Sequence, residues 1–184
     1  MAESFDVDGI YYRIDESNNA IVTGCVPEAT TTSTSLKGAI AITSPPSSAS
    51  TIQVVTLTIP STVEINLVTY PVTAIGVNAF QNRTDITIII IPDSVRNIRD
   101  NAFSGCSSLI SIIMGNSVKT IGNNVFAGCS SLVTLTIPYS VETIGDSAFS
   151  GCVGLTSIII PNLATIVASN AFDGCTSLAR FYKI

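Results

Sequence analysis

The chain has 184 residues, of which 46% are apolar and only 11% are charged. Lysine and arginine number 8 against 13 acidic residues, and the resulting net charge of −5 has the wrong sign for phosphate binding, which excludes a nucleic-acid partner. Histidine is absent, which excludes histidine metal sites and Ser/His or Cys/His catalytic pairs. No apolar run approaches the ~18 residues of a membrane-spanning helix, so we expect no direct membrane insertion.

The N-terminal region, residues 1–69, is predicted to form a cap. Residues 5–24 alternate apolar and polar side chains around a polar turn at residues 16–19, which predicts a β-hairpin. Residues 28–51 are dominated by Ser, Thr, Ala and Pro, which predicts loops around a short strand at residues 36–42. We expect the hairpin to cover the open end of the region that follows.

Residues 70–184 repeat every 23 residues without an insertion. The five units span 70–92, 93–115, 116–138, 139–161 and 162–184. Two residue types, phenylalanine and cysteine, recur with this period. The phenylalanines are Phe80, Phe103, Phe126, Phe149 and Phe172, and the cysteines are Cys106, Cys129, Cys152 and Cys175. A unit of this size cannot bury its own apolar face, so its stability must come from stacking on its neighbours.

Each unit contains two strand-like segments and one turn. In the unit 139–161, the β-branched run Leu155–Pro161 predicts a short strand that ends at its proline. The run Val141–Gly145 predicts a second, shorter strand. Asp146 is expected to cap one helical turn, and Gly151 to end that turn in a left-handed conformation. Stacked units would then place equivalent strands side by side in parallel sheets.

The pattern Ser-Val-x-x-Ile-Gly-x-x-Ala-Phe-x-Gly-Cys-x-x-Leu-x-x-Ile-x-Ile-Pro resembles the BspA-like class of leucine-rich repeat. Residues 5–14 resemble the cap that precedes such repeats. The resemblance implies a mostly β repeat solenoid, a right-handed coil of leucine-rich repeats with parallel strands, short helical turns and an N-terminal β cap. Departures include Arg83 in place of the first cysteine and Phe181–Ile184 in place of the last strand pattern, and atypical edge repeats are usual in solenoids.

The cysteine column is the first candidate for chemistry. One thiol per coil would place neighbouring thiols about 5 Å apart. However, no Cys-x-x-Cys pair offers a compact metal site, and no histidine offers a base. We therefore interpret the cysteines, together with the phenylalanines, as a buried structural ladder. Parallel side-chain directions argue against disulfides within it, and Cys25 lies outside it.

Acidic residues are the second candidate, because a carboxylate pair can hydrolyse glycosides without histidine. Asp100 and Asp146 share a repeat position, but they lie two coils apart with Asn123 between them, a separation of about 10 Å. Helix capping explains both, and no acidic column runs through consecutive coils to hold calcium. We expect no enzymatic activity, no cofactor and no metal. Asn82 begins a glycosylation sequon, which is relevant in a secreted eukaryotic protein.

Outward-facing strand positions are the candidate for binding. If Leu155, Ile158 and Ile160 point into the core, their neighbours point outward. Over five units this rule gives a first column of Ile88, Ser111, Thr134, Ser157 and Arg180, and a second column of Ile90, Ile113, Thr136, Ile159 and Tyr182. An exposed apolar stripe usually marks a partner site. The alternatives are that β-branched residues simply suit strands, or that the cap covers the stripe.

We therefore expect non-enzymatic recognition of another protein through the strand face. The resemblance implies adhesion to a host, matrix or surface macromolecule, and hence a cell-surface or secreted protein. Residues 1–4 lack the features of a signal peptide, so that location requires a removed leader, and a cytoplasmic location stays open. The alternative function is an intracellular scaffold, or a structural protein that self-associates through the solenoid ends.

Overall fold

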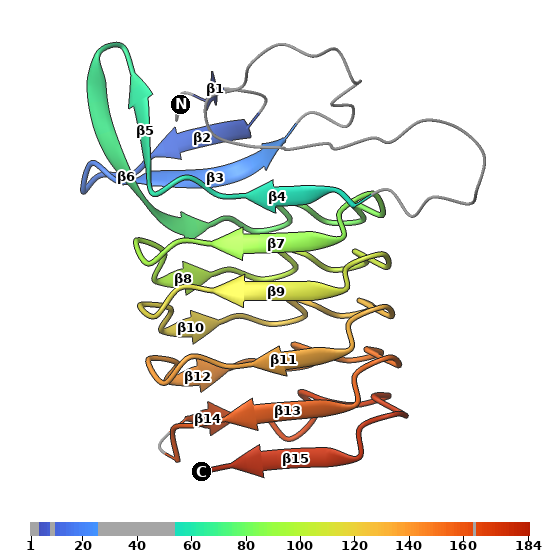
Figure 1. Cartoon of the computed structure of the whole chain (residues 1–184). Helices are drawn as coiled ribbons and strands as arrows, with labels where there is room; N and C mark the ends of the chain where they lie inside the picture. The colour runs from blue at the N-terminus through green and yellow to red at the C-terminus, as the bar shows by residue number, and fades with distance from the viewer. Residues whose placement is uncertain (1–3, 8–9, 26–53, 164) are drawn as a thin grey trace, which may run out of the picture.

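A computed structural model describes residues 4–7, 10–25, 54–163 and 165–184, and within these ranges the chain forms strands and turns but no helix. The strands stack into a solenoid with the N-terminal strands at one end (Figure 1). The strand predicted at residues 36–42 lies outside the described residues. The strands are β1 (Ser4–Val7), β2 (Ile10–Ile14), β3 (Ala20–Cys25), β4 (Thr56–Thr58), β5 (Thr62–Ile65), β6 (Val68–Ile75), β7 (Ile88–Ile91), β8 (Asn97–Ile98), β9 (Ser111–Met114), β10 (Thr120–Ile121), β11 (Thr134–Thr136), β12 (Thr143–Ile144), β13 (Ser157–Ile160), β14 (Ile166–Val167) and β15 (Arg180–Lys183).

The predicted N-terminal hairpin is confirmed as the antiparallel pair β2–β3, and β1 adds a third antiparallel strand. Its turn is held by Asp15, whose Oδ1 accepts the backbone N–H groups of Ser17 and Asn19, each at 2.9 Å. These hydrogen bonds, the one from Asn19 foremost, lower the pKa of Asp15. Strand β3 then pairs in parallel with β6, so the hairpin lies directly on the first coil (Figure 1).

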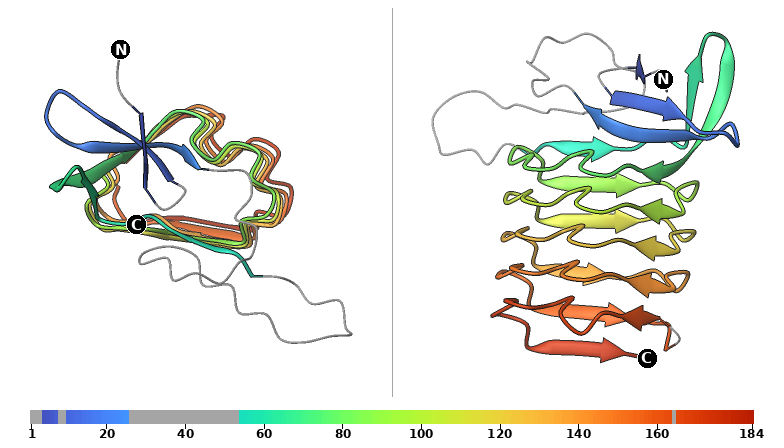
Figure 2. Two further views of the ribbon diagram at one scale, coloured as in Figure 1. Left: turned by 90° about the horizontal axis from the view of Figure 1, so that it is seen from above. Right: turned by 180° about the vertical axis from the view of Figure 1, so that it is seen from behind.

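Each coil contributes one strand to either side of the solenoid, as the two strand-like segments predicted. On one side, β4-β7-β9 and β11-β13-β15 form two parallel three-stranded sheets. On the other side, the short strands β8, β10, β12 and β14 continue the sheet that begins at β6. From β7 onward every paired residue is 23 positions from its partner, as in Thr134↔Ser157. Viewed from above, the coils superpose closely (Figure 2).

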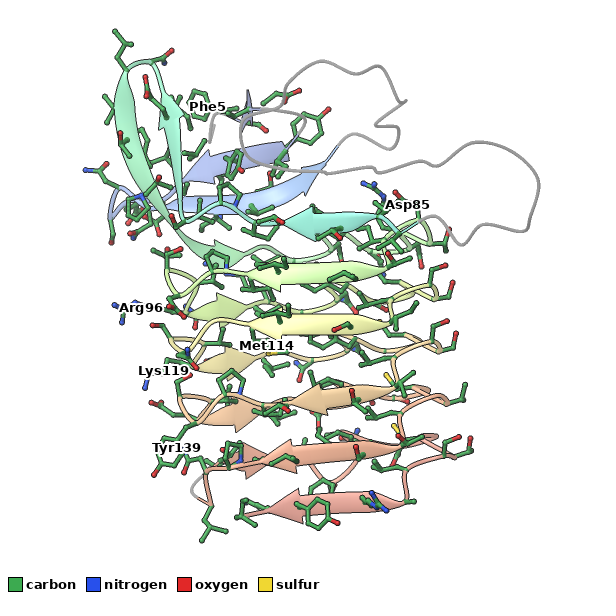
Figure 3. The ribbon with its side chains drawn as sticks, in the orientation of Figure 1. Phe5, Asp85, Arg96, Met114, Lys119 and Tyr139 are labelled. Atoms are coloured by element: carbon green, nitrogen blue, oxygen red, sulfur yellow. The ribbon has the colours of Figure 1, made fainter. Side chains whose placement is uncertain are left out.

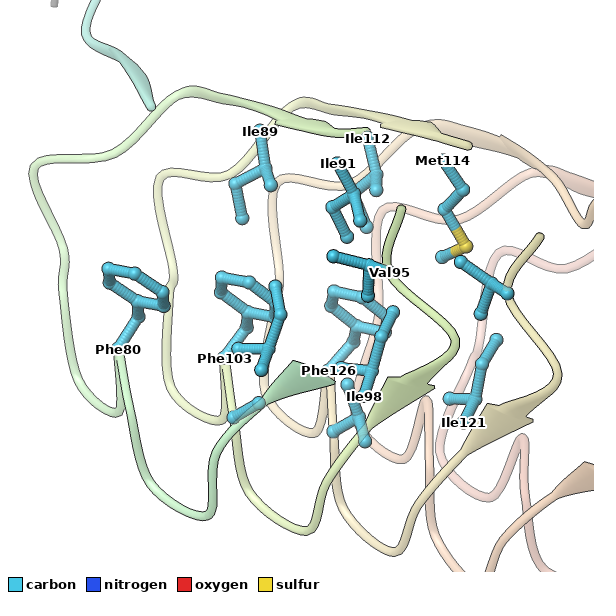
Figure 4. Close-up of a cluster of buried hydrophobic side chains, with 14 of the residues drawn as sticks. Phe80, Ile89, Ile91, Val95, Ile98, Phe103, Ile112, Met114, Ile121 and Phe126 are labelled. Atoms are coloured by element: carbon cyan, nitrogen blue, oxygen red, sulfur yellow. The ribbon is translucent and has the colours of Figure 1, made fainter. Parts of the chain in front are cut away.

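The core between the two sides is built from equivalent apolar residues of successive coils (Figure 4). The phenylalanine rings form a continuous stack, with centroids 5.2–5.5 Å apart from Phe80 to Phe172. Phe103, Phe126 and Phe149 are fully buried, whereas Phe172 in the last coil is half-buried. Stacking between neighbouring coils therefore buries the phenylalanine rings in the middle of the solenoid, whereas the ring of the last coil stays partly exposed.

The turns differ from the predicted helical turns. The backbone N–H of Phe103 donates to Val125 O of the next coil at 2.9 Å, and that of Gly105 donates to Ala127 O at 2.8 Å. Because these amides donate to the next coil, they do not form the i→i−4 hydrogen bonds of an α-helix. Left-handed residues also interrupt the segment, because Asn101 has φ 56° and Gly105 has φ 75°. The left-handed glycine that was predicted is confirmed in four coils, at Gly105, Gly128, Gly151 and Gly174.

The expected helix caps likewise join one coil to the next. Asp100 Oδ1 accepts the backbone N–H of Asn123 at 2.8 Å, and Asn123 Oδ1 accepts that of Asp146 at 2.8 Å. The column of side chains that was predicted to cap a turn within each coil is therefore a hydrogen-bonded ladder between coils. In the described part of the chain, a search for helices that could span a lipid bilayer finds none.

Candidate protein-binding surface

We call the outward side of β7, β9, β11, β13 and β15 the strand face. Its alternation follows from strand geometry, because neighbouring residues point to opposite sides. Ile112 and Ile158 point inward and are buried. The residues that follow them, Ile113 and Ile159, point outward and are 55% and 38% exposed. The side chains of the strand face are drawn in Figure 3.

The structure places both predicted columns on the strand face, with an exposure that differs from coil to coil. Ile88, Ile90, Ser111 and Ser157 are partly buried, and Thr134, Thr136 and Arg180 are exposed. Tyr182, at the end of the second column, is 48% exposed. Parallel pairing aligns the columns, since Ile90 lies beside Ile113, and Ile159 beside Tyr182.

The strand face is uncharged over most of its length. From Ile88 to Ile159, both columns contain only isoleucine, serine and threonine, and Arg180 is the single charged member. Its alternating branched apolar groups and hydroxyls present few charges that a partner would have to desolvate. Such a surface can bury apolar area against another protein at low electrostatic cost.

A third column of exposed residues, which the sequence pattern did not predict, precedes the strands. Ile110 is 42% exposed and Val133 is 44% exposed, and both lie directly before the first column. The period-2 rule does not reach them, because each follows a buried leucine at a turn rather than within a strand. Their shared repeat position was the available signal.

The third column lines an open groove of about 740 Å³ along the edge of the strand face. Its apolar lining comes from Val55, Ile110 and Val133, and its hydroxyl groups include those of Ser108 and Ser131. At one end, Arg83 binds Asp85 through two hydrogen bonds, Nε to Oδ1 at 2.8 Å and Nη2 to Oδ2 at 2.7 Å. The hydrogen bonds from Arg83 lower the pKa of Asp85. Both side chains are therefore charged, and their opposite charges neutralise each other.

The cysteine column lies inside the solenoid. Cys106, Cys129 and Cys152 are fully buried and Cys175 is half-buried, and all four are free thiols. Each Sγ lies 3.1–3.4 Å from the carbonyl oxygen of the phenylalanine 26 residues earlier, to which the thiol donates. Burial raises the pKa of Cys152 to about 12 and that of Cys129 further. At neutral pH the thiols of Cys129 and Cys152 are therefore protonated, which makes them poor nucleophiles and poor metal ligands.

Of the two acidic candidates, Asp100 forms a structural hydrogen bond through its carboxylate, and Asp146 forms one through its backbone N–H. Asp100 holds the backbone of Asn123, and Asn123 separates it from Asp146. Within the described ranges, no group of three or more Cys, Asp or Glu side chains is arranged to hold a metal ion. The sequon residue Asn82 is exposed, with φ 60°, at the repeat position that glycine occupies in later coils.

Stacked 23-residue coils, parallel strands and an N-terminal β cap define the class as a leucine-rich-repeat β-solenoid. Residues 53–179 match the model of the BspA type leucine rich repeat region, with 6 copies, and the chain belongs to this family. A comparison with curated proteins finds no match.

Solved structures of bacterial proteins share the fold. A leucine rich cell surface protein of Faecalibacterium prausnitzii aligns with a TM-score of 0.74 and 23% identity, over 98% of this chain and 39% of its own. The T. pallidum leucine-rich repeat protein aligns with a TM-score of 0.60 and 24% identity, over 98% and 82%. The pneumococcal vaccine antigen PcpA aligns with a TM-score of 0.64 and 19% identity, over 100% and 49%. The chain therefore spans less than half the length of the first and the last of these proteins.

Proposed function

We propose that this chain is a non-enzymatic recognition module that binds another protein through its strand face. The observation that carries the proposal is the apolar stripe of Ile113, Ile159 and Tyr182, which stays exposed on a solenoid that buries equivalent inward residues fully. Large exposed apolar side chains in register over several coils are typical of a partner site. The family supports the same conclusion, because repeat solenoids offer extended binding surfaces.

The rigid stack favours binding, because it holds the interface side chains in place before the partner arrives. Each strand of the face is hydrogen-bonded to a neighbour, and its inward residues are packed in the core. Little conformational entropy is then lost on association. The small number of charges on the strand face predicts a partner surface that is also apolar and uncharged.

We further propose that the module acts at a cell surface, on a host or matrix protein. Support comes from the Faecalibacterium prausnitzii cell surface protein and the pneumococcal antigen, whose folds resemble this one. These likenesses concern the fold, and fold alone does not assign a ligand. The choice of partner class therefore depends on a binding experiment.

The test measures binding of the wild-type chain and the double variant Ile113→Glu/Ile159→Glu to a panel of immobilised, purified extracellular-matrix and host-surface proteins. We expect the variant to lose binding, because two carboxylates would be buried against an apolar partner. The circular dichroism spectrum and melting temperature should be close to wild type, because both residues point to solvent.

Ile166→Glu is the matched control. Ile166 is 70% exposed in β14, on the opposite side of the solenoid, so the variant adds a glutamate without touching the strand face. It should bind as the wild type does. Equal loss in both variants, or retained binding by the double variant, would refute the strand face as the site, and absence of binding across the panel would refute the host and matrix assignment.

A further inference from the structure

An insertion interrupts the repeat next to the cap. Strand β4 pairs with β7 as Thr56↔Ile88, 32 residues apart, whereas β7 pairs with β9 as Ile88↔Ser111, 23 residues apart. The additional residues are accommodated in the antiparallel hairpin β5–β6, which projects from the solenoid (Figure 1). Strand β5 has a structural role up to the turn, because Val63 and Ile65 are buried.

The tip of the hairpin has no comparable role. Leu67 is 91% exposed, the highest value of any large apolar side chain in the described residues, and the adjacent Val68 is 49% exposed. Asn66 has φ 52° and Leu67 has φ 66°, as in a type I′ turn, whose second position favours glycine. Leucine is therefore unfavourable here in both its backbone conformation and its exposure. Folding alone would be served better by glycine or asparagine.

A protruding leucine requires an apolar hollow in its partner, and this chain has one. The groove lined by Val55, Ile110 and Val133 has room for a leucine side chain. The hairpin follows β4, whereas Ile110 and Val133 precede β9 and β11, so tip and groove lie at opposite ends of the strands. In Figure 3 the hairpin and Asp85, which lines the groove, lie on opposite sides of the molecule. A tip cannot reach its own groove.

The absence of unpaired charge at the hairpin tip and in the groove favours contact between these two surfaces of different copies. Residues 66–69 at the tip are uncharged, and the single charged pair of the groove, Arg83–Asp85, is self-neutralised. Elsewhere, two copies that each carry a net charge of −5 repel one another. Tip and groove can therefore meet without burying an unpaired charge.

We propose that the Leu67 tip of one copy docks in the groove of a second copy. The contact joins two different surfaces, so each copy offers one tip and one groove, and more than two copies can join the assembly. It uses neither the exposed isoleucines of the strand face nor the last coil. It is thus independent of the proposed function.

The test is sedimentation velocity of the whole chain over a range of protein concentrations. The wild type should show a sedimentation coefficient that rises with concentration. Leu67→Gly and Leu67→Asn should remain monomeric with an unreduced melting temperature, because both residues tolerate the left-handed conformation. Ile110→Thr/Val133→Thr should also remain monomeric, and threonine is what the same column holds at Thr87 and Thr156.

Mixing gives the sharpest readout. Leu67→Gly retains a groove and Ile110→Thr/Val133→Thr retains a tip, so the mixture should form a 1:1 complex and nothing larger. Leu163→Ser, which changes another exposed leucine, and Ile113→Glu/Ile159→Glu should both assemble as the wild type does. A wild type that stays monomeric up to millimolar concentration, an assembling Leu67→Asn variant, a mixture without the complex, or loss of assembly in either control would overturn the proposal.

Discussion

Every coil from the second onward carries a cysteine whose thiol donates to a phenylalanine carbonyl of the preceding coil. The repeat spacing alone predicted free thiols, and the four ladder cysteines are free. The hydrogen bond could not be predicted, because it depends on how far one coil advances over the next. The raised pKa values follow mainly from burial, with a further contribution from neighbouring thiols.

The cysteine column predicts a stability loss at alkaline pH. Burial raises the pKa of Cys152 from its ordinary 9.0 to about 12. Above pH 9 the unfolded chain therefore releases this proton while the folded chain retains it, so the free energy of unfolding falls as the pH rises toward 12. The expected slope is about 1.4 kcal/mol per pH unit for one such thiol.

Urea unfolding of the wild type and Cys152→Ala at several alkaline pH values measures this slope. The variant is less stable at neutral pH, because it leaves a small cavity, but its stability should fall less steeply above pH 9. Other groups titrate equally in both proteins, so the difference isolates the thiol. Parallel curves for the two proteins would contradict the assignment.

At the scale of elements, the phenylalanine stack predicts a gradient of stability along the solenoid. Phe126 is buried with rings on both sides at 5.5 and 5.4 Å, whereas Phe172 is half-buried and lies in the last coil. Phe126→Ala should destabilise the chain by about 3–5 kcal/mol, and Phe172→Ala by less. Phe126→Leu, which retains most of the volume, should have a smaller effect than Phe126→Ala.

Chemical denaturation of these variants checks the gradient. In a stack of coupled coils, a defect in the middle weakens contacts with two neighbours, while a defect in the last coil weakens contacts with one. Equal losses for Phe126→Ala and Phe172→Ala would show that the coils do not depend on their neighbours in this way.

Repeat periodicity predicted the strands, the left-handed glycines and the inward phenylalanines, because these recur at one position in every coil. It did not predict the turns, since the amides near Phe103 bond to the next coil instead of forming a helix. Nor did it predict the β5–β6 hairpin, because the insertion lies before the first regular unit and has no second copy for comparison. A feature that occurs only once in the chain cannot be predicted from the repeat pattern.

At the scale of the whole molecule, the low charge of the chain has two sources. Inward positions are apolar and form one continuous core, and many outward positions carry serine or threonine rather than charged groups. The exposed isoleucines of the strand face are apolar residues that lie outside this core, so folding does not require them. The sequence predicted their direction, but it missed Ile110 and Val133, which border the same face from a turn.

An uncharged interface predicts binding that depends little on salt. Raising the ionic strength screens charge–charge attraction within a Debye length of about 10 Å at 0.1 M, but leaves apolar burial intact. The dissociation constant for a partner bound at the strand face should therefore change little between low and high salt in titration calorimetry, with a negative heat-capacity change. A steep loss of affinity with salt would instead indicate a charged site.

The strand face is the surface through which we propose that the chain binds its partner. Hydroxyl-radical footprinting tests this proposal by comparing side-chain oxidation of the free chain with that of the chain bound to a matrix or host protein from the panel. We expect protection of Ile113, Ile159 and Tyr182 in the complex, while Ile166 and Leu163, which are exposed elsewhere, stay fully reactive. Protection of Ile166 with unchanged oxidation of Ile113 and Ile159 would contradict it.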